Sequence, residues 1–156
     1  AYRWRIKSPV EQVVGTVRAF GLTERLPRMV RDTQLQNQVL FDPPSVAGWD
    51  WGQAWVNSNT LLARANYAGE ITRRPRPGVS LDAAALLRAN GATGSAEQVV
   101  DFALELAVGG DVDAGTRSTL IEHVGGSHFN FTQAERSGAL QGLFYLALTM
   151  PLAQLA

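Results

Sequence analysis

The sequence predicts an all-α fold of about six or seven short helices packed as an irregular bundle. Three observations predict it. Apolar residues recur at helical spacing, and Ser, Thr or Asp precedes several of these runs where a helix cap is needed. No segment alternates apolar and polar residues as a half-buried strand would.

The composition is that of one globular domain. The chain has 156 residues, of which 46% are hydrophobic and 18% charged, which excludes wholesale disorder. The 14 basic and 14 acidic side chains balance, so we expect no nucleic-acid partner. The absence of Cys excludes disulfides, thiolate metal sites and cysteine nucleophiles. We expect residues 1–156 to form one all-helical domain, with residues 73–79 as the candidate linker if it is subdivided.

The first predicted helix begins after Ser8. Ser8 can cap it, Pro9 suits its first position, and Glu11 can complete a capping box. Gly21 supplies the stop, and a second, more polar helix is predicted over residues 27–39. The apolar face of the first helix consists of Val10, Val13, Val14, Val17 and Phe20.

A Trp- and Pro-rich loop is predicted between the second and third helices. Residues 41–52 are not expected to form a regular element, because Pro43 and Pro44 fix the local backbone near polyproline geometry and two glycines interrupt the aromatic residues that follow. The third helix is expected to begin at Ser58 or Asn59, either of which can cap it.

Four further helices are predicted beyond the linker. Their expected starts are Ser80, Ser95, Asp113 and Thr132. The last is predicted to run to about Thr149. No charge follows Arg136, but the solid apolar run covers only residues 143–148, too short for a membrane span. We expect a central core helix there.

A long motif lies within residues 40–66. It reads Pro-Pro-x-Val-x-Gly-Trp, then x-x-Gly-x-x-Trp-Val-Asn-Ser, then Leu-Leu-x-Arg, and a Lys-x-Pro-x-Glu block precedes it at residues 7–11. In this sequence the motif residues are Pro43, Pro44, Val46, Gly48, Trp49, Gly52, Trp55, Val56, Asn57, Ser58, Leu61, Leu62 and Arg64. From about Arg5 to Tyr67 the chain resembles the C-terminal part of the bacterial domain of unknown function 1800 family.

The resemblance implies a cellular location and a longer parent protein, and it indicates no chemical reaction. Proteins of the family are usually several hundred residues longer, mostly upstream, so we expect this chain to be a C-terminal piece. Its expected partner is then the upstream part of the same protein or another chain. Family members often carry export signals, which implies a periplasmic or extracellular location. The chain begins without a signal-peptide pattern, so we expect such a signal upstream or removed.

The loop supplies the candidate binding residues Trp49, Asp50, Trp51, Trp55 and Asn57. Indole rings can stack on the apolar face of a sugar while carboxylate and amide groups take its hydroxyls. The alternative is that Trp49 and Trp55 pack between the flanking helices. Trp51 is the expected exposed ring, because the family pattern does not require an aromatic residue there.

Two polar groupings outside the loop have structural interpretations. Glu11 and Arg64, one in each family block, are predicted to form a buried ion pair that fixes two helices. Glu122, His123 and His128 could ligate a metal, but a diglycine interrupts the helical spacing of a zinc site. We expect no metal and no cofactor.

Three functions remain open from the sequence. The first is a structural or interaction module of an exported bacterial protein. The alternative is carbohydrate or cell-envelope glycan binding at the Trp49–Trp55 loop. A second alternative is part of a hydrolase, with Asp42, Asp50 or Glu11 acting beside upstream residues. No convergent nucleophile and base are signalled, so enzymatic activity is uncertain and a non-enzymatic role is favoured.

Overall fold

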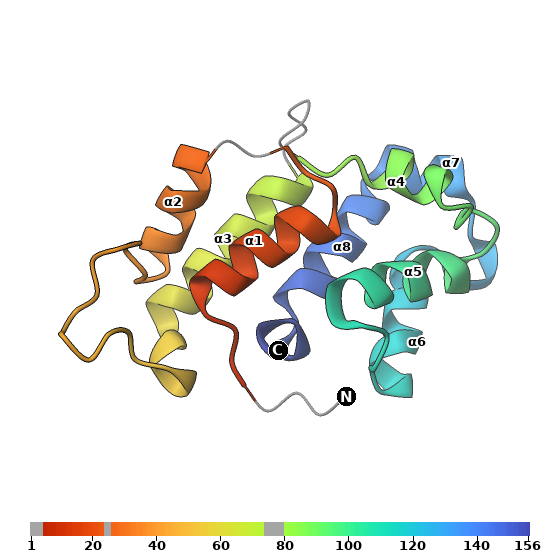
Figure 1. The fold of residues 1–156 in the computed structure, drawn as a ribbon. Coiled ribbons are helices and arrows are strands. Elements are labelled where there is room, and N and C mark those ends of the chain that lie inside the picture. The colour runs from red at the N-terminus through yellow and green to blue at the C-terminus, as the bar shows by residue number, and fades with distance from the viewer. Residues whose placement is uncertain (1–4, 24–25, 74–79) are drawn as a thin grey trace.

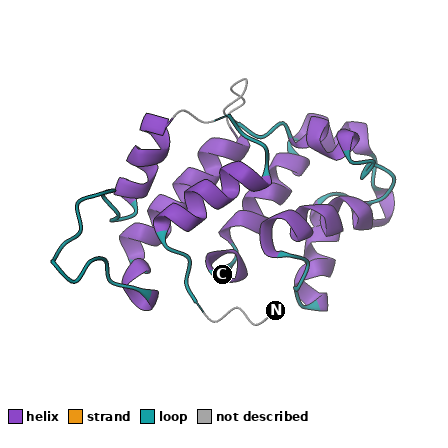
Figure 2. Cartoon of the chain, viewed as in Figure 1, coloured by secondary structure: helices purple, strands orange, loops and turns teal. Residues whose placement is uncertain are grey.

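The computed structural model describes residues 5–23, 26–73 and 80–156. Within these residues eight α-helices and three short 3₁₀ turns are joined by loops (Figures 1 and 2), which confirms the all-α prediction at a slightly higher helix count. The helices are α1 (Pro9–Ala19), α2 (Leu26–Leu35), α3 (Ser58–Arg73), α4 (Ala83–Ala89), α5 (Ala96–Val108), α6 (Ala114–His123), α7 (Phe131–Ser137) and α8 (Ala139–Thr149). The 3₁₀ turns are η1 (Gly52–Trp55), η2 (Gly126–His128) and η3 (Pro151–Gln154).

Helix α8 is the core of the bundle. It lies between α3 and α5 in Figure 1, and it also contacts α4, α6 and α7. Leu140, Leu143, Phe144 and Ala147 are fully buried, and the rings of Phe144 and Phe20 pack in a T-shaped pair with a centroid distance of 5.7 Å. The expected central core helix is therefore present. Among the described residues no helix is long and apolar enough to span a membrane.

The hydrophobic cluster includes residues from both sides of the candidate linker, such as Tyr67 on α3 and Leu104 on α5. Of the linker itself, residues 74–79 lie outside the described residues, and α3 extends to Arg73.

Helix α1 begins as predicted. The Ser8 hydroxyl accepts a hydrogen bond from the Glu11 N–H at 3.3 Å, and the Glu11 carboxylate accepts one from the Ser8 N–H at 2.8 Å. This reciprocal pair satisfies two backbone donors that the first turn of a helix leaves free.

Helix α2 ends at Leu35, four residues before the predicted end. Asn37 adopts a left-handed conformation with φ 68°, which Asn tolerates better than most residues. The Asn37 N–H then donates to the Gln34 carbonyl and the Gln38 N–H to the Thr33 carbonyl, each at 2.9 Å. This pattern is a Schellman motif, and it terminates the helix.

The predicted helix over residues 132–149 is two helices. Asn130, rather than Thr132, caps α7 by accepting from the Gln133 N–H at 3.0 Å. Gly138 then ends α7 with φ 79°, a conformation that glycine adopts without steric cost, and α8 begins directly after it. Helix α4 likewise begins after Asp82 rather than Ser80, whereas α5 and α6 begin after the predicted caps.

Two leucines of α8 provide a matched test of this core. Leu143→Ala is expected to lower the free energy of unfolding by about 2–5 kcal/mol, because the side chain is fully buried and its removal leaves a cavity. Leu146→Ala, at a position 39% exposed on the same helix, should change it by about 0.5 kcal/mol or less. Urea unfolding followed by circular dichroism measures both, and equal losses would contradict the burial of α8.

Candidate functional site

The Trp loop contains both packed and exposed rings. Trp55 is buried at the end of η1, and Trp49 is half-buried beside it, with ring centroids 6.0 Å apart and an interplanar angle of 41°. This arrangement is the one expected if the two rings pack against the flanking structure. Trp51 is 82% exposed, as its departure from the family pattern led us to expect.

The two polar candidate residues of the loop differ in whether their side chains are already hydrogen-bonded within the protein. Asp50 is exposed. Asn57 caps α3, because its side-chain oxygen accepts from the N–H groups of Asn59 and Thr60 at 2.9 and 3.0 Å. The Thr60 hydroxyl accepts from the Asn57 N–H at 2.9 Å in return. Helix α3 therefore begins at Ser58 as expected, but its cap is Asn57 rather than Ser58 or Asn59, and the Asn57 oxygen is already engaged in capping.

Most of the exposed large apolar side chains lie on one stretch of chain. Among the described residues only Leu146 stands apart from it. The stretch comprises the end of α2, the loop and the start of α3, which together form the left end of the molecule in Figure 1. We call it the 35–62 apolar surface, and its members are Leu35, Val39, Phe41, Val46, Trp51, Leu61 and Leu62.

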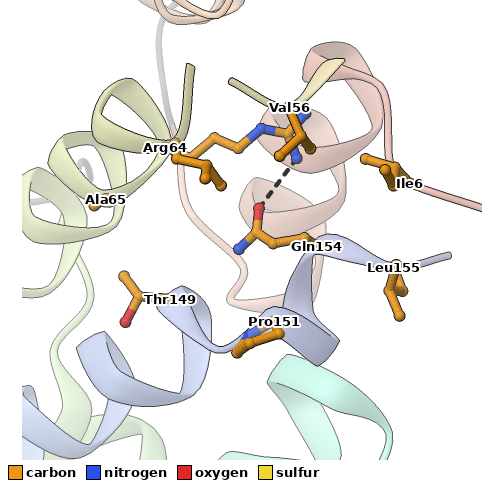
Figure 3. Close-up of a pocket in the computed structure, with 9 residues that line it drawn as sticks. Ile6, Val56, Arg64, Ala65, Thr149, Pro151, Gln154 and Leu155 are labelled. Carbon is orange, nitrogen blue, oxygen red and sulfur yellow. Dashed lines mark hydrogen bonds between the residues drawn. The ribbon is translucent and has the colours of Figure 1, made fainter. Parts of the chain in front are cut away.

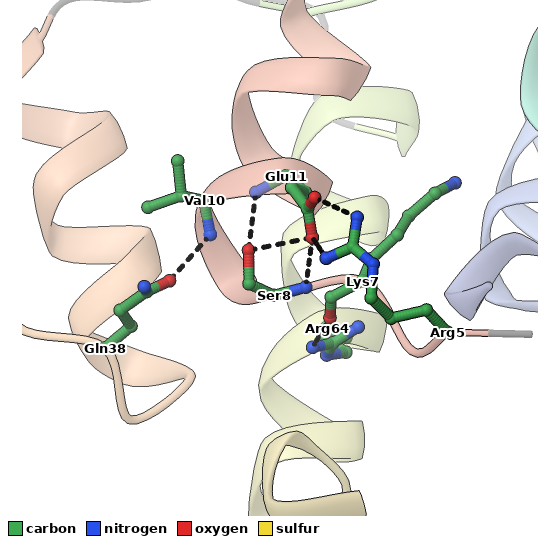
Figure 4. A network of polar contacts seen from close by, with 7 residues as sticks. All are labelled: Arg5, Lys7, Ser8, Val10, Glu11, Gln38 and Arg64. Carbon is green, nitrogen blue, oxygen red and sulfur yellow. Dashed lines mark hydrogen bonds and ion pairs between the residues drawn. The ribbon is translucent and has the colours of Figure 1, made fainter. Parts of the chain in front are cut away.

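The ion pair predicted between Glu11 and Arg64 is replaced by separate contacts (Figure 4). The Glu11 carboxylate accepts from the Arg5 guanidinium at 2.9 Å, because the capping box turns it toward the segment before α1. Arg64 donates from Nη2 to the Lys7 carbonyl at 2.8 Å and from Nη1 to the Gln154 side-chain oxygen at 3.1 Å. The two family blocks are thus joined through a backbone carbonyl rather than through a carboxylate.

Arg64 is only 2% exposed, and its Nε has no hydrogen-bond partner. Burial lowers the pKa of Arg64 to about 10, so the side chain remains charged at neutral pH. Its two acceptors are neutral groups. The described partners of this buried cation are therefore dipoles alone, and an opposite charge would stabilise it.

The contacts of Arg64 lie where the two ends of the described chain meet. Ile6 and Leu155 form an isolated antiparallel bridge, the Lys7 N–H donates to the Gln154 carbonyl at 2.8 Å, and the Ala156 N–H donates to the Arg5 carbonyl at 2.7 Å. Sequence analysis missed Gln154 as a partner. The sequence feature that could have indicated it is a single amide side chain shortly after the apolar last helix. A polar side chain buried at such a position needs a hydrogen-bond partner.

Other candidate groups are not assembled into a site. In the part of the chain that the structure describes, no three His, Asp or Glu side chains are grouped so as to hold a metal ion. His123, Glu122 and His128 are exposed at the end of α6 and in η2.

Comparison with known proteins places this fold in a family. The model of the family described as "Protein of unknown function (DUF1800)" matches residues 2–155, so the chain belongs to that family. The match extends the resemblance seen in residues 5–67 over nearly the whole chain, including α4 to α7. Neither a curated protein nor a solved structure matches the chain.

The Arg5–Glu11 pair predicts a pH-dependent contribution to stability. The hydrogen bond from Arg5, assisted by those from Ser8, lowers the pKa of Glu11 against the opposing effect of burial. Because the folded pKa lies below the unfolded value of about 4.3, the pair stabilises the fold above that pH and the contribution is lost as pH falls through the folded pKa. Glu11→Gln should therefore cost about 0.2–1 kcal/mol at pH 7, since the pair is partly exposed, and nothing near pH 2.

Urea unfolding of the wild type and Glu11→Gln across this pH range measures the effect. Arg5→Gln is the control, because in that background the pH-dependent effect of Glu11→Gln should shrink to the part that the Ser8 hydrogen bonds contribute. A difference that stays constant from pH 7 to pH 2 would contradict the pairing, because the capping box itself tolerates Gln.

Proposed function

We propose that this chain is an interaction module of an exported bacterial protein and that its 35–62 apolar surface contacts a partner protein. The observation that carries the proposal is the concentration of exposed apolar side chains on that surface. Phe41 is fully exposed, as is Val46, and Trp51 is nearly so. Soluble proteins rarely expose large apolar patches unless the patch binds something.

The backbone at Phe41 supports this interpretation. Phe41 has φ 65°, in the left-handed region that a bulky side chain rarely occupies. Such a conformation costs of order 1–3 kcal/mol and is typically found at functional positions. The Phe41 ring is exposed, so its burial does not offset the cost of this backbone conformation. Burial of the ring in an interface would offset that cost.

The charges of the segment define the chemistry of the partner. Between Arg31 and Arg64 the charged residues are Asp32, Asp42 and Asp50, and the last two are exposed in the loop. A partner with an apolar centre and basic groups at its rim complements this surface. The exported location comes from the family resemblance, and a periplasmic or extracellular partner follows from it.

Photo-crosslinking at the surface tests the proposal. A benzophenone amino acid at position 41 or 46 should yield one discrete crosslinked protein from an extract of the periplasm and cell envelope, and the same group at position 146 should not. Val46→Asp should then weaken binding of the identified partner at least about tenfold, as removal of an interface anchor does. Leu146→Asp, at an exposed apolar position outside the surface, should leave it unchanged.

The absence of a discrete product at positions 41 and 46, or equal crosslinking at position 146, would overturn the proposal. Whether the product is the upstream part of the same protein or a separate polypeptide is read from its mass and sequence.

Glycan binding at the Trp49–Trp55 loop is the second candidate, favoured by the exposed Trp51 ring beside the exposed Asp50 carboxylate. A tryptophan-fluorescence titration separates it from the first candidate. If envelope polysaccharide shifts the Trp emission of the wild type but not that of Trp51→Ala, the result supports glycan binding. If the emission does not change on titration, glycan binding is contradicted and the partner-protein proposal remains. The hydrolase alternative stays a prediction that depends on residues outside this chain, and Glu11 is occupied by its cap and by Arg5.

A further inference from the structure

A largely apolar pocket of about 500 Å³ opens beside Arg64 (Figure 3). Its walls come from the segment before α1, from the start of α3 and from the chain around η3, so it lies at the junction of the two chain ends. A volume of this size is typical of small-molecule sites. The apolar part of the lining consists of Ile6, Val56, Leu61, Ala65, Pro151 and Leu155.

Few polar groups line the pocket, and two of them, Thr149 and Gln154, already donate hydrogen bonds to backbone carbonyls of the protein. The Thr149 hydroxyl donates to the Tyr145 carbonyl at 2.9 Å. Gln154 donates from Nε2 to the Leu148 carbonyl at 3.3 Å, which leaves its oxygen facing Arg64. Arg64 is the single charged residue among those that line the pocket.

Among the described residues that charge has no counterion. The described contacts of Arg64 are to the carboxamide of Gln154 and to the Lys7 carbonyl, and its Nε donor is buried without a partner. A guanidinium presents its N–H groups as a planar fork that matches the two oxygens of a carboxylate. The pocket therefore combines a desolvated, uncompensated cation with an aliphatic wall.

We propose that this pocket binds an aliphatic monocarboxylate, with the carboxylate on the Arg64 fork and the hydrocarbon chain along the apolar wall. One cation matches one negative charge, so a monoanion fits where a phosphate dianion would remain half neutralised and desolvated. A positively charged headgroup would be repelled by Arg64. The inference does not depend on the proposed partner protein, which contacts a different set of side chains apart from Leu61.

Isothermal titration of the 156-residue chain with decanoate, decanol and decyltrimethylammonium at pH 7 tests the headgroup. Each probe is kept below the concentration at which it forms micelles. Decanoate should bind at least about tenfold more tightly than decanol, because a hydrogen-bonded charge contributes about 1.5–3 kcal/mol. The ammonium compound should not bind.

Two neighbouring leucines locate the site. Leu61 lines the pocket, whereas Leu62 is exposed and does not. Leu61→Trp should weaken decanoate binding at least tenfold by filling the pocket, and Leu62→Trp should leave it unchanged. Arg64→Lys keeps the charge without the fork and should weaken decanoate binding while leaving decanol unaffected, with folding checked by circular dichroism.

Equal affinities for decanoate and decanol would overturn the proposal. So would the absence of heat with decanoate, or equal effects of the two leucine substitutions. The Leu61/Leu62 comparison keeps the proposal testable if the Arg64 variant does not fold.

Discussion

The guanidinium of Arg64 is buried, and its described hydrogen-bond partners are neutral groups. These hydrogen bonds hold the segment before α1 and the segment at η3 against α3, and the junction between those two segments depends on them. One hydrogen bond goes to the Lys7 carbonyl just before α1, and the other goes to Gln154 at the end of η3. Because Arg64 belongs to α3, the central part of the chain, it ties both ends to the same helix. Desolvation of the charge makes these bonds costly to leave unmade.

The two halves of the molecule joined at this junction differ in the polarity of their interiors. Around α8 the interior is apolar and closely packed. Near α2 the buried residues are largely polar, and the Gln36 carboxamide is fully buried without a hydrogen-bond partner. Burial raises the pKa of Asp32 in the same region, so its ionised form is disfavoured there despite the nearby Arg28. The end of the molecule that carries the 35–62 apolar surface is thus the less apolar in its interior, and it is the end that we propose contacts a partner.

Local signals in the sequence predicted much of this fold. The Ser8–Glu11 capping box, the caps of α5 and α6, and the irregular Trp loop all follow from residue types at fixed spacing. The end of α2 did not follow, because Asn37 rather than a glycine adopts the left-handed turn. Gly138 also went unrecognised as a helix break within an otherwise continuous helical pattern, although its type permitted one.

The candidate site was less predictable than the fold. The exposure of Trp51 followed from a departure from the family motif. The partners of Arg64 could not be read from spacing, because one is a backbone carbonyl and the other lies 90 residues away in sequence. An Arg in a conserved-looking motif suggests a carboxylate partner, whereas tertiary packing places Arg64 against amide groups and a pocket. Pockets formed where chain ends meet have no sequence signature of their own.

Hydrogen exchange at the Lys7 and Ala156 amides tests the role of Arg64 most directly, because both amides donate across the junction that it closes. In Arg64→Met the exchange of these two amides should accelerate at least about tenfold relative to wild type, while the amides of Leu143 and Phe144 within α8 keep their protection. Unchanged protection of Lys7 and Ala156 in a folded Arg64→Met protein would show that the chain ends are held without the buried guanidinium, which contradicts the account.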